Sequence, residues 1–228
     1  AEAMMLHTED NEVGGVSIQE VNALTALKAD AWLIGPGMGR AEQTLDMIRE
    51  FLPLVQVPCV LDADALFAVC GYLRLLKKAK APLVITPHPG EMAKLLGVSV
   101  ADVQGNRVAV AEGFAKQTNV VVVLKGAGTI VATPEGRIFV NQTGNPGMAT
   151  GGSGDVLAGM VATLLAQGMV PAVAAACAVW LHGRAGVEQA QQKAREIQNS
   201  AVPNNIMATA TTTQRWMVFS MRSRFCAP

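Results

Sequence analysis

The chain has 228 residues, enough for one domain or two small ones, and half of them are apolar, so it can bury a sizeable core. Basic and acidic residues number 18 each, which makes the formal net charge zero, and only 4% of the residues are aromatic. This composition argues against a nucleic-acid or anionic-membrane binder, which would usually be basic, and against a platform on which bases stack.

The first predicted strand covers residues 31–34, and a glycine-rich turn follows it at 35–39. Gly37 and Gly39 in this turn would let a ligand approach the backbone closely, because glycine has no side chain to block it. The pattern of apolar residues that comes next predicts a helix over 41–51.

A second predicted strand, 57–61, ends at a pair of carboxylates, Asp62 and Asp64. Two carboxylates at a strand end could bind a metal ion or the hydroxyl groups of a ribose. Alternatively, Asp64 caps a helix, since aspartate is favoured at that position. The sequence leaves this choice open.

The third predicted strand, 83–85, runs into a proline-rich segment, and residues 92–96 have a helical pattern. Within that segment His88 stands between two prolines, where a histidine is most often a rigid turn residue. Glu91 could cap the helix or help to hold Mg²⁺ through water, and capping is the favoured role.

Residues 120–124 form the fourth predicted strand, and Lys125 opens a glycine-containing turn after it. Backbone amides and a lysine suit phosphate oxygens, whereas the plainer interpretation is a turn with a solvated lysine. Residues 129–132 and 137–140 then resemble the two strands of a hairpin.

The densest glycine cluster lies between Gly144 and Gly154, where five glycines lead into Asp155. Helices are expected over 154–167 and 170–192. A glycine-rich turn that opens a helix leaves backbone N–H groups free to hold a phosphate or a developing oxyanion. Asp155 then fits a base that takes a proton from a hydroxyl during phosphoryl transfer, although aspartate is also a common helix cap.

Two asparagines stand at the start of this cluster. Asn141 and Asn145 could orient the loop or contact a substrate, and the sequence does not distinguish the two roles.

Continuous apolar strands separated by helices predict an α/β protein with a mostly parallel sheet that is covered on both faces. In such sheets ligands bind beyond the carboxyl ends of the strands. Because each predicted strand ends in glycine, aspartate, histidine or lysine, we expect these groups to converge on one edge and form an active site.

No apolar run reaches membrane-spanning length without interruption, and no signal-peptide pattern opens the chain. The four cysteines form no C-x-x-C pair, and the three histidines are too scattered to indicate a metal cluster. We therefore expect a cytoplasmic protein with buried free thiols and no membrane partner.

Five segments stand in an order and spacing that resemble a known family: GPGMG (35–39), LDADAL (61–66), ITPHPGE (85–91), LKGAGT (124–129) and GNPGMATGGSGD (144–155). The family is that of the ADP-dependent NAD(P)H-hydrate dehydratases, the carboxy-terminal domain of YjeF-type bifunctional repair proteins. The resemblance covers about residues 3–187 and implies a ribokinase-like three-layer fold. It also implies a metabolite-repair lyase that passes a phosphoryl group from ADP or ATP, with Mg²⁺, to the 6-hydroxyl of hydrated NADH or NADPH and then eliminates phosphate.

The same resemblance implies roles for individual residues. The catalytic set would be Asp155 as the base, with the amides of Gly152, Ser153 and Gly154 around the phosphoryl group. The nucleotide-binding set would be Lys125, Gly126, Ala127, Gly128, Thr129 and Gly154. The substrate would contact Gly37, Gly39, His88, Asn145 and Asp155, and Glu91 would reach Mg²⁺ only through water.

The two ends of the chain depart from the family pattern. Members normally begin with a strand and a glycine-rich turn, so the dehydratase domain, expected over residues 1–195, is expected to lack the first strands. Residues 196–228 are expected to be a divergent, poorly ordered tail. Many relatives assemble into tetramers, so a homo-oligomer is a further expectation from the resemblance.

Two other interpretations share the glycine-rich loop and Asp155. One is a small-molecule kinase of the same fold, acting on a thiazole, hydroxymethylpyrimidine or pyridoxal alcohol. The other is an inactive nucleotide-binding fragment. The segments around His88 and Lys125 favour the dehydratase over the kinase.

Overall fold

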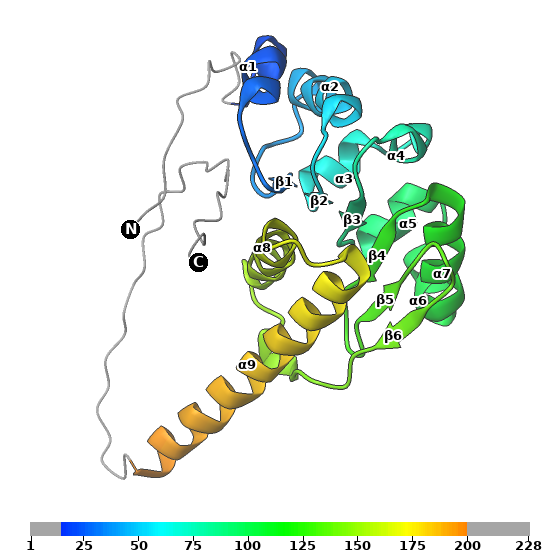
Figure 1. Ribbon diagram of the computed structural model, residues 1–228. Coiled ribbons are helices and arrows are strands. Elements are labelled where there is room, and N and C mark those ends of the chain that lie inside the picture. The colour runs from blue at the N-terminus through cyan, green and yellow to red at the C-terminus, as the bar shows by residue number, and fades with distance from the viewer. Residues whose placement is uncertain (1–14, 200–228) are drawn as a thin grey trace.

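The computed structural model describes residues 15–199, which form a six-stranded sheet between layers of helices (Figure 1). The strands lie in the order β1-β2-β3-β4-β5-β6; the first four are parallel, and β5 and β6 are antiparallel to their neighbours. Their bounds are β1 Trp32–Ile34, β2 Cys59–Leu61, β3 Leu83–Ile85, β4 Val121–Leu124, β5 Ile130–Ala132 and β6 Ile138–Val140. This confirms the mostly parallel α/β sheet and the terminal hairpin.

The helices connect and cover the strands. Their bounds are α1 Val21–Ala26, α2 Glu42–Phe51, α3 Asp64–Ala68, α4 Arg74–Lys78, α5 Pro89–Leu96, α6 Val100–Gly105, α7 Arg107–Thr118, α8 Ser153–Ala166 and α9 Pro171–Asn199. Helix α9 continues beyond residue 192, where the sequence pattern ended it. Of the expected tail, residues 196–199 are helical and residues 200–228 lie outside the described residues.

Strands β2 to β5 are buried on both faces because their side chains alternate between two apolar layers, whereas the edge strand β6 is largely exposed. One layer packs the sheet against α8 and α9, and its strand residues are Val60, Val84, Val121, Val123 and Val131. The other packs it against α2, α3, α5 and α7, and its strand residues include Ile34, Leu61, Ile85, Val122 and Leu124. Figure 1 shows α8 and α9 on one side of the sheet and the remaining helices on the other.

Two expectations from the sequence concerned the cysteines and membrane-spanning segments. Cys59, Cys70 and Cys177 are free thiols, and burial raises the pKa of the Cys59 thiol. Within residues 15–199, no helix combines the length and the apolar character that a bilayer crossing requires.

The turn after β1 depends on Gly35. Its φ is +120°, and a Cβ there would overlap the carbonyl oxygen of Asp62 and lie 2.8 Å from the Cβ of Ala65. Gly35→Ala is therefore expected to lower the free energy of unfolding by at least about 2 kcal/mol, because backbone strain and overlap act together. Urea denaturation measures this change.

A matched control is Gly113→Ala in the middle of α7, where the added methyl group meets no other atom within 4 Å. This exposed helical position is expected to gain about 0.5–1 kcal/mol on the same change. Equal stability of the two variants would contradict the role assigned to Gly35.

Candidate active site

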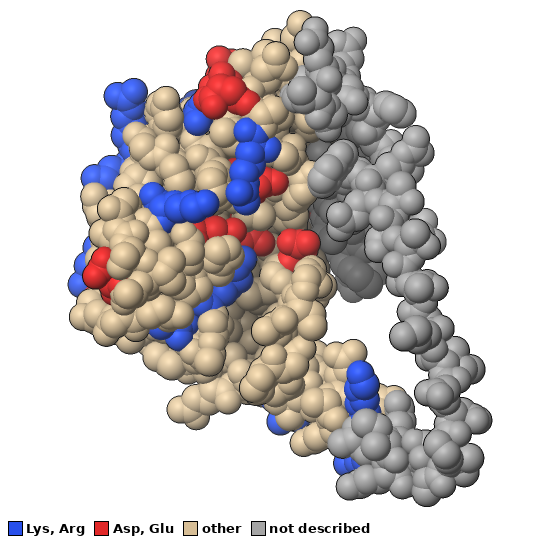
Figure 2. Space-filling view, turned by 180° about the vertical axis from the view of Figure 1, so that it is seen from behind, with Lys and Arg blue, Asp and Glu red and all other residues tan. Residues whose placement is uncertain are grey.

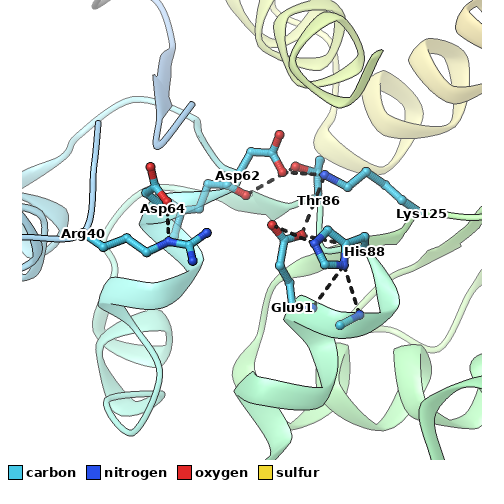
Figure 3. Close-up of polar contacts among 9 residues, drawn as sticks. Arg40, Asp62, Asp64, Thr86, His88, Glu91 and Lys125 are labelled. Atoms are coloured by element: carbon cyan, nitrogen blue, oxygen red, sulfur yellow. Dashed lines mark hydrogen bonds and ion pairs between the residues drawn. The ribbon is translucent and has the colours of Figure 1, made fainter. Parts of the chain in front are cut away.

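The carboxyl ends of β2, β3 and β4 meet in a network of buried charges (Figure 3). The Nζ atom of Lys125 lies 2.8 Å from Oδ1 of Asp62 and 3.8 Å from Oε2 of Glu91. The Asp62 side chain is 1% exposed and that of Lys125 18%. Lys125 is therefore not a solvated turn residue, and its ammonium group neutralises carboxylates from two neighbouring strand ends.

The turn after β2 separates the two carboxylates that the sequence pairs. Ala63 has φ +48°, which is rare for a residue with a side chain, and the turn sends Asp62 toward Lys125 and Asp64 toward Arg40 (Figure 3). The two carboxylates therefore have different protein partners, and the metal or ribose role that the sequence left open stays untested for either one. A second oxygen of Asp62, Oδ2, is buried with no hydrogen-bond partner among the described residues.

Asp64 fixes the glycine-rich turn after β1. Its Oδ2 accepts the N–H of Gly39 at 3.0 Å, and its Oδ1 accepts from Nε of Arg40 at 2.6 Å. The Arg40 guanidinium also lies 3.7 Å from the ring centroid of Phe67. Asp64 makes no side-chain cap bond to α3, so the helix-cap interpretation is wrong, and its role is to hold the loop that carries Gly37 and Gly39.

His88 and Glu91 cap the start of α5 reciprocally. Nδ1 of His88 accepts the N–H groups of Gly90 at 3.0 Å and Glu91 at 3.3 Å, and Oε2 of Glu91 accepts the N–H of His88 at 2.7 Å. The capping role of Glu91 is confirmed. The other ring nitrogen, Nε2, lies 3.4 Å from Oε1 of Glu91, and the His88 side chain is exposed.

Burial raises the pKa of the Glu91 carboxyl, and the positive charge of Lys125 opposes this shift. Both carboxylate oxygens have partners within the protein. In the part of the chain described, no group of three or more His, Cys, Asp or Glu side chains is arranged to hold a metal ion. The expected contact of Glu91 with Mg²⁺ was one through water, and it stays a prediction.

The glycine cluster opens α8 directly beside Lys125. Gly152 caps the helix with φ +83°, and a Cβ on Gly154 would lie 3.3 Å from Nζ of Lys125. The N–H of Ser153 donates to the carbonyl of Thr150 at 3.3 Å. Contrary to the expectation, this amide is therefore not free to bind a phosphoryl group. The amides of Gly154 and Asp155 remain at the helix end, where first-turn N–H groups have no intrahelical partner.

Asp155 occupies the first turn of α8, on its exposed side. Partial burial raises the pKa of its carboxyl, the negative charge of Asp62 adds to the rise, and Lys125 opposes it. A raised pKa makes the ionised form of an aspartate a better proton acceptor. The structure thus brings a carboxylate, an ammonium group and a helix N-terminus together, an arrangement compatible with phosphoryl transfer to a hydroxyl.

The loop before α8 is tied to α9 by its two asparagines. Nδ2 of Asn141 donates to the carbonyl of Val179 at 3.4 Å, and Nδ2 of Asn145 donates to that of Gly186 at 2.7 Å. Both side chains therefore orient the loop, which is one of the two roles the sequence left open. The substrate contact of Asn145 stays a prediction.

Sequence reasoning passed over His182, which α9 brings to the start of α8. Its Nε2 lies 3.4 Å from Oγ of Ser153, and burial lowers the pKa of its imidazole. No local pattern marks this contact, because it depends on how two helices pack.

Lysine, arginine and acidic side chains are interspersed over the described part of the face seen in Figure 2.

Comparisons with known proteins agree with this geometry. Residues 2–208 match the family model described as NAD(P)H-hydrate dehydratase. The chain is 47% identical over 194 residues to the bifunctional NAD(P)H-hydrate repair enzyme Nnr of Moorella thermoacetica, which covers 84% of this chain and 37% of that protein.

Two solved structures share its architecture. One is an ADP/ATP-dependent NAD(P)H-hydrate dehydratase from Bacillus subtilis, co-crystallised with ATP and Mg²⁺, with 32% identity and a TM-score of 0.61 over 80% of this chain and 61% of that one. The other is a ribokinase-like superfamily protein from Enterococcus faecalis, with 30% identity and a TM-score of 0.64 over 77% of this chain and 62% of that one. The ribokinase-like fold is thereby established, and the chain spans less than two thirds of each of these relatives.

Proposed function

We propose that this chain, which belongs to the NAD(P)H-hydrate dehydratase family, uses a nucleotide to dehydrate hydrated NADH or NADPH and restore the reduced cofactor. The observation that carries this proposal is the position of Asp155 in the first turn of α8, with Lys125 Nζ close to Gly154 in the same turn. We assign the activity to residues 1–195.

In the first step, the nucleotide's terminal phosphoryl group passes to the 6-hydroxyl of the hydrated nicotinamide. Asp155 takes the hydroxyl proton as the new O–P bond forms, and the bond to the leaving nucleotide breaks. Lys125 and the free amides at the start of α8 stabilise negative charge on the phosphoryl group in transfer. ADP as donor leaves AMP, and ATP leaves ADP.

In the second step, phosphate leaves carbon 6 as the lone pair of the ring nitrogen forms a double bond to that carbon. The departing phosphate then takes the proton from carbon 5, and the electrons of that C–H bond form the C5–C6 double bond and restore the dihydropyridine ring. The protein's contribution is to hold the adduct in place and keep it from solvent. The proposed contacts of the substrate are the loop of Gly37 and Gly39, which Asp64 holds, and the exposed side chain of His88.

Mg²⁺ commonly binds proteins through one or two carboxylates together with nucleotide phosphates. Oε2 of Glu91 caps α5 and Oε1 lies 3.4 Å from Nε2 of His88, so the proposal keeps for Glu91 only a contact with the ion through water. The ion would supply charge neutralisation on the phosphates when it is bound.

The direct test is to incubate the chain with hydrated NADH, Mg²⁺ and either ADP or ATP, and to follow the return of NADH absorbance. We expect recovery that depends on nucleotide, with AMP and phosphate as co-products when ADP is used. Reactions without nucleotide and without protein are the controls. Phosphorylation of a thiazole or pyrimidine alcohol, with hydrated NADH left unchanged, would overturn the proposal in favour of a kinase.

The pH dependence of turnover reports the base. Because the pKa of Asp155 is raised by burial and by Asp62, the acid limb of kcat/KM is expected above the pH at which an ordinary aspartate titrates. Asp62→Asn removes a negative charge that raises the pKa of Asp155, and it leaves the positive charge of Lys125, which lowers that pKa, without its partner at position 62. The acid limb of kcat/KM is therefore expected to move to lower pH in this variant.

The control for this shift is Glu112→Gln, which removes an acidic group paired with Lys116 on α7. The pH dependence of kcat/KM in Glu112→Gln is expected to match that of the parent chain. An acid limb that does not move in Asp62→Asn would contradict the assignment of Asp155 as the base.

A further inference from the structure

We infer that Arg107, the first residue of α7, is a positioning residue that holds the 125–129 loop in the shape that receives the nucleotide's phosphates. The inference rests on the nucleotide-binding part of the proposed function. It adds a residue from another element of the fold, outside the five segments that carry the family resemblance.

The guanidinium group of Arg107 is bonded to the backbone of the loop at three points. Nη1 donates to the carbonyl of Ala127 at 2.5 Å, and Nη2 donates to the carbonyls of Leu124 at 3.1 Å and Lys125 at 3.3 Å. The three carbonyls belong to the end of β4 and the turn that follows it. One planar group thus fixes the direction in which the chain leaves the strand, and with it the residue that pairs with Asp62.

Gly126 makes this contact sterically feasible. Its φ is +143°, and a Cβ on it would lie 2.8 Å from Nη2 of Arg107. Any side chain at position 126 would therefore push against the guanidinium. Gly126, which the family resemblance places in the nucleotide-binding set, thus also makes room for Arg107.

Turning the three carbonyls toward Arg107 has a consequence for the other side of the loop. A peptide group whose C=O points one way directs its N–H roughly the opposite way. The N–H of Lys125 donates to the carbonyl of Pro87 at 2.9 Å, so it is the N–H groups of Gly126 and Gly128 that Arg107 directs to the opposite side, where they suit phosphate oxygens.

The charge of Arg107 supports the same role. Within residues 15–199, none of its contacts is to a carboxylate, and its buried Nε has no hydrogen-bond partner. Burial lowers the pKa of the guanidinium, and no neighbouring acid offsets this. A cation that is partly desolvated and not neutralised leaves a positive potential at the loop, which an anionic ligand would lower.

The test measures ADP binding directly, so it does not require turnover. Arg107→Gln and Arg107→Lys are titrated with ADP by isothermal calorimetry, alongside the parent chain. We expect the Kd of Arg107→Gln to rise at least about tenfold, because charge-assisted hydrogen bonds to the loop are lost. Arg107→Lys keeps the charge but cannot span three carbonyls, so its Kd is expected to fall between those of the parent and Arg107→Gln.

The matched control is Arg137→Gln, which removes an exposed arginine near Glu135 in the β5–β6 hairpin. Its Kd is expected to equal that of the parent. At saturating ADP the kcat of Arg107→Gln is expected to fall much less than its KM for ADP rises, since Asp155 is untouched. A purely structural role would lower the melting temperature without this split.

Three outcomes are distinguishable. The inference is overturned if the Kd for ADP is unchanged in Arg107→Gln, or if Arg137→Gln loses as much affinity for ADP. Either result leaves the proposed function in place. A parent chain that binds ADP without dehydrating its substrate refutes the proposed function, and the Kd comparison still decides the role of Arg107. A parent chain that does not bind ADP overturns both.

Discussion

Asp155→Asn is expected to reduce turnover by about 10²–10⁴-fold, the range for loss of a general base, while the Kd for ADP changes by less than about threefold. Asparagine has nearly the shape of aspartate, so the start of α8 and the position of Lys125 beside Gly154 are preserved. Only the proton acceptor is lost. Single-turnover measurements at saturating nucleotide separate this chemical defect from any defect in binding.

Stability offers an independent check on the same variant. A carboxyl whose pKa is raised in the folded state favours folding when it is protonated, and this contribution is lost as the pH rises through the folded pKa. Above the folded pKa the ionised Asp155 is held in an unfavourable environment, so Asp155→Asn is expected to be no less stable than the parent chain there.

The control is Asp46→Asn on α2, where an exposed carboxylate pairs with Arg49. It is expected to retain parental turnover. If Asp155→Asn lost nucleotide binding or stability in parallel with activity, Asp155 would be a structural residue at the helix start instead of a base.

Much of the fold could be predicted because its signals are local. Runs such as Leu83–Ile85 and Val121–Leu124 are continuous, apolar and short, which is typical of strands buried on both faces. Helix α7, Arg107–Thr118, was missed, although its buried residues follow helical spacing. They are Ala111, Phe114, Ala115 and Thr118. Three of the four are small or polar, so they gave little apolar signal.

The gathering of site residues was predictable for a topological reason, since parallel strands end at the same edge of a sheet. Their pairing was not. Whether Lys125 bonds Asp62 or Asp64 depends on the turn at Ala63, whose positive φ leaves no mark in the sequence. Arg107 was missed for a related reason, because it comes from a helix that precedes β4 and meets the loop only in the folded chain.

Lys125→Met is expected to weaken ADP binding strongly and to lower the free energy of unfolding. The variant removes the ammonium group beside Gly154, where the nucleotide's phosphates are proposed to lie. It also leaves Asp62, at 1% exposure, without its ion-pair partner. Removing one member of a buried pair typically costs about 3–5 kcal/mol. Calorimetric titration and urea denaturation measure the two effects separately.

The double variant Asp62→Asn with Lys125→Met distinguishes these effects. It removes both charges of the pair, so most of the lost stability is expected to return, while ADP binding is not expected to recover. Lys116→Met, which removes an exposed lysine paired with Glu112, serves as the surface control and is expected to cost less than about 1 kcal/mol. Recovery of nucleotide binding in the double variant would mean that Lys125 supports the loop only by neutralising Asp62. Binding that stays weak in a stable protein would assign the ammonium group a direct part in holding phosphate.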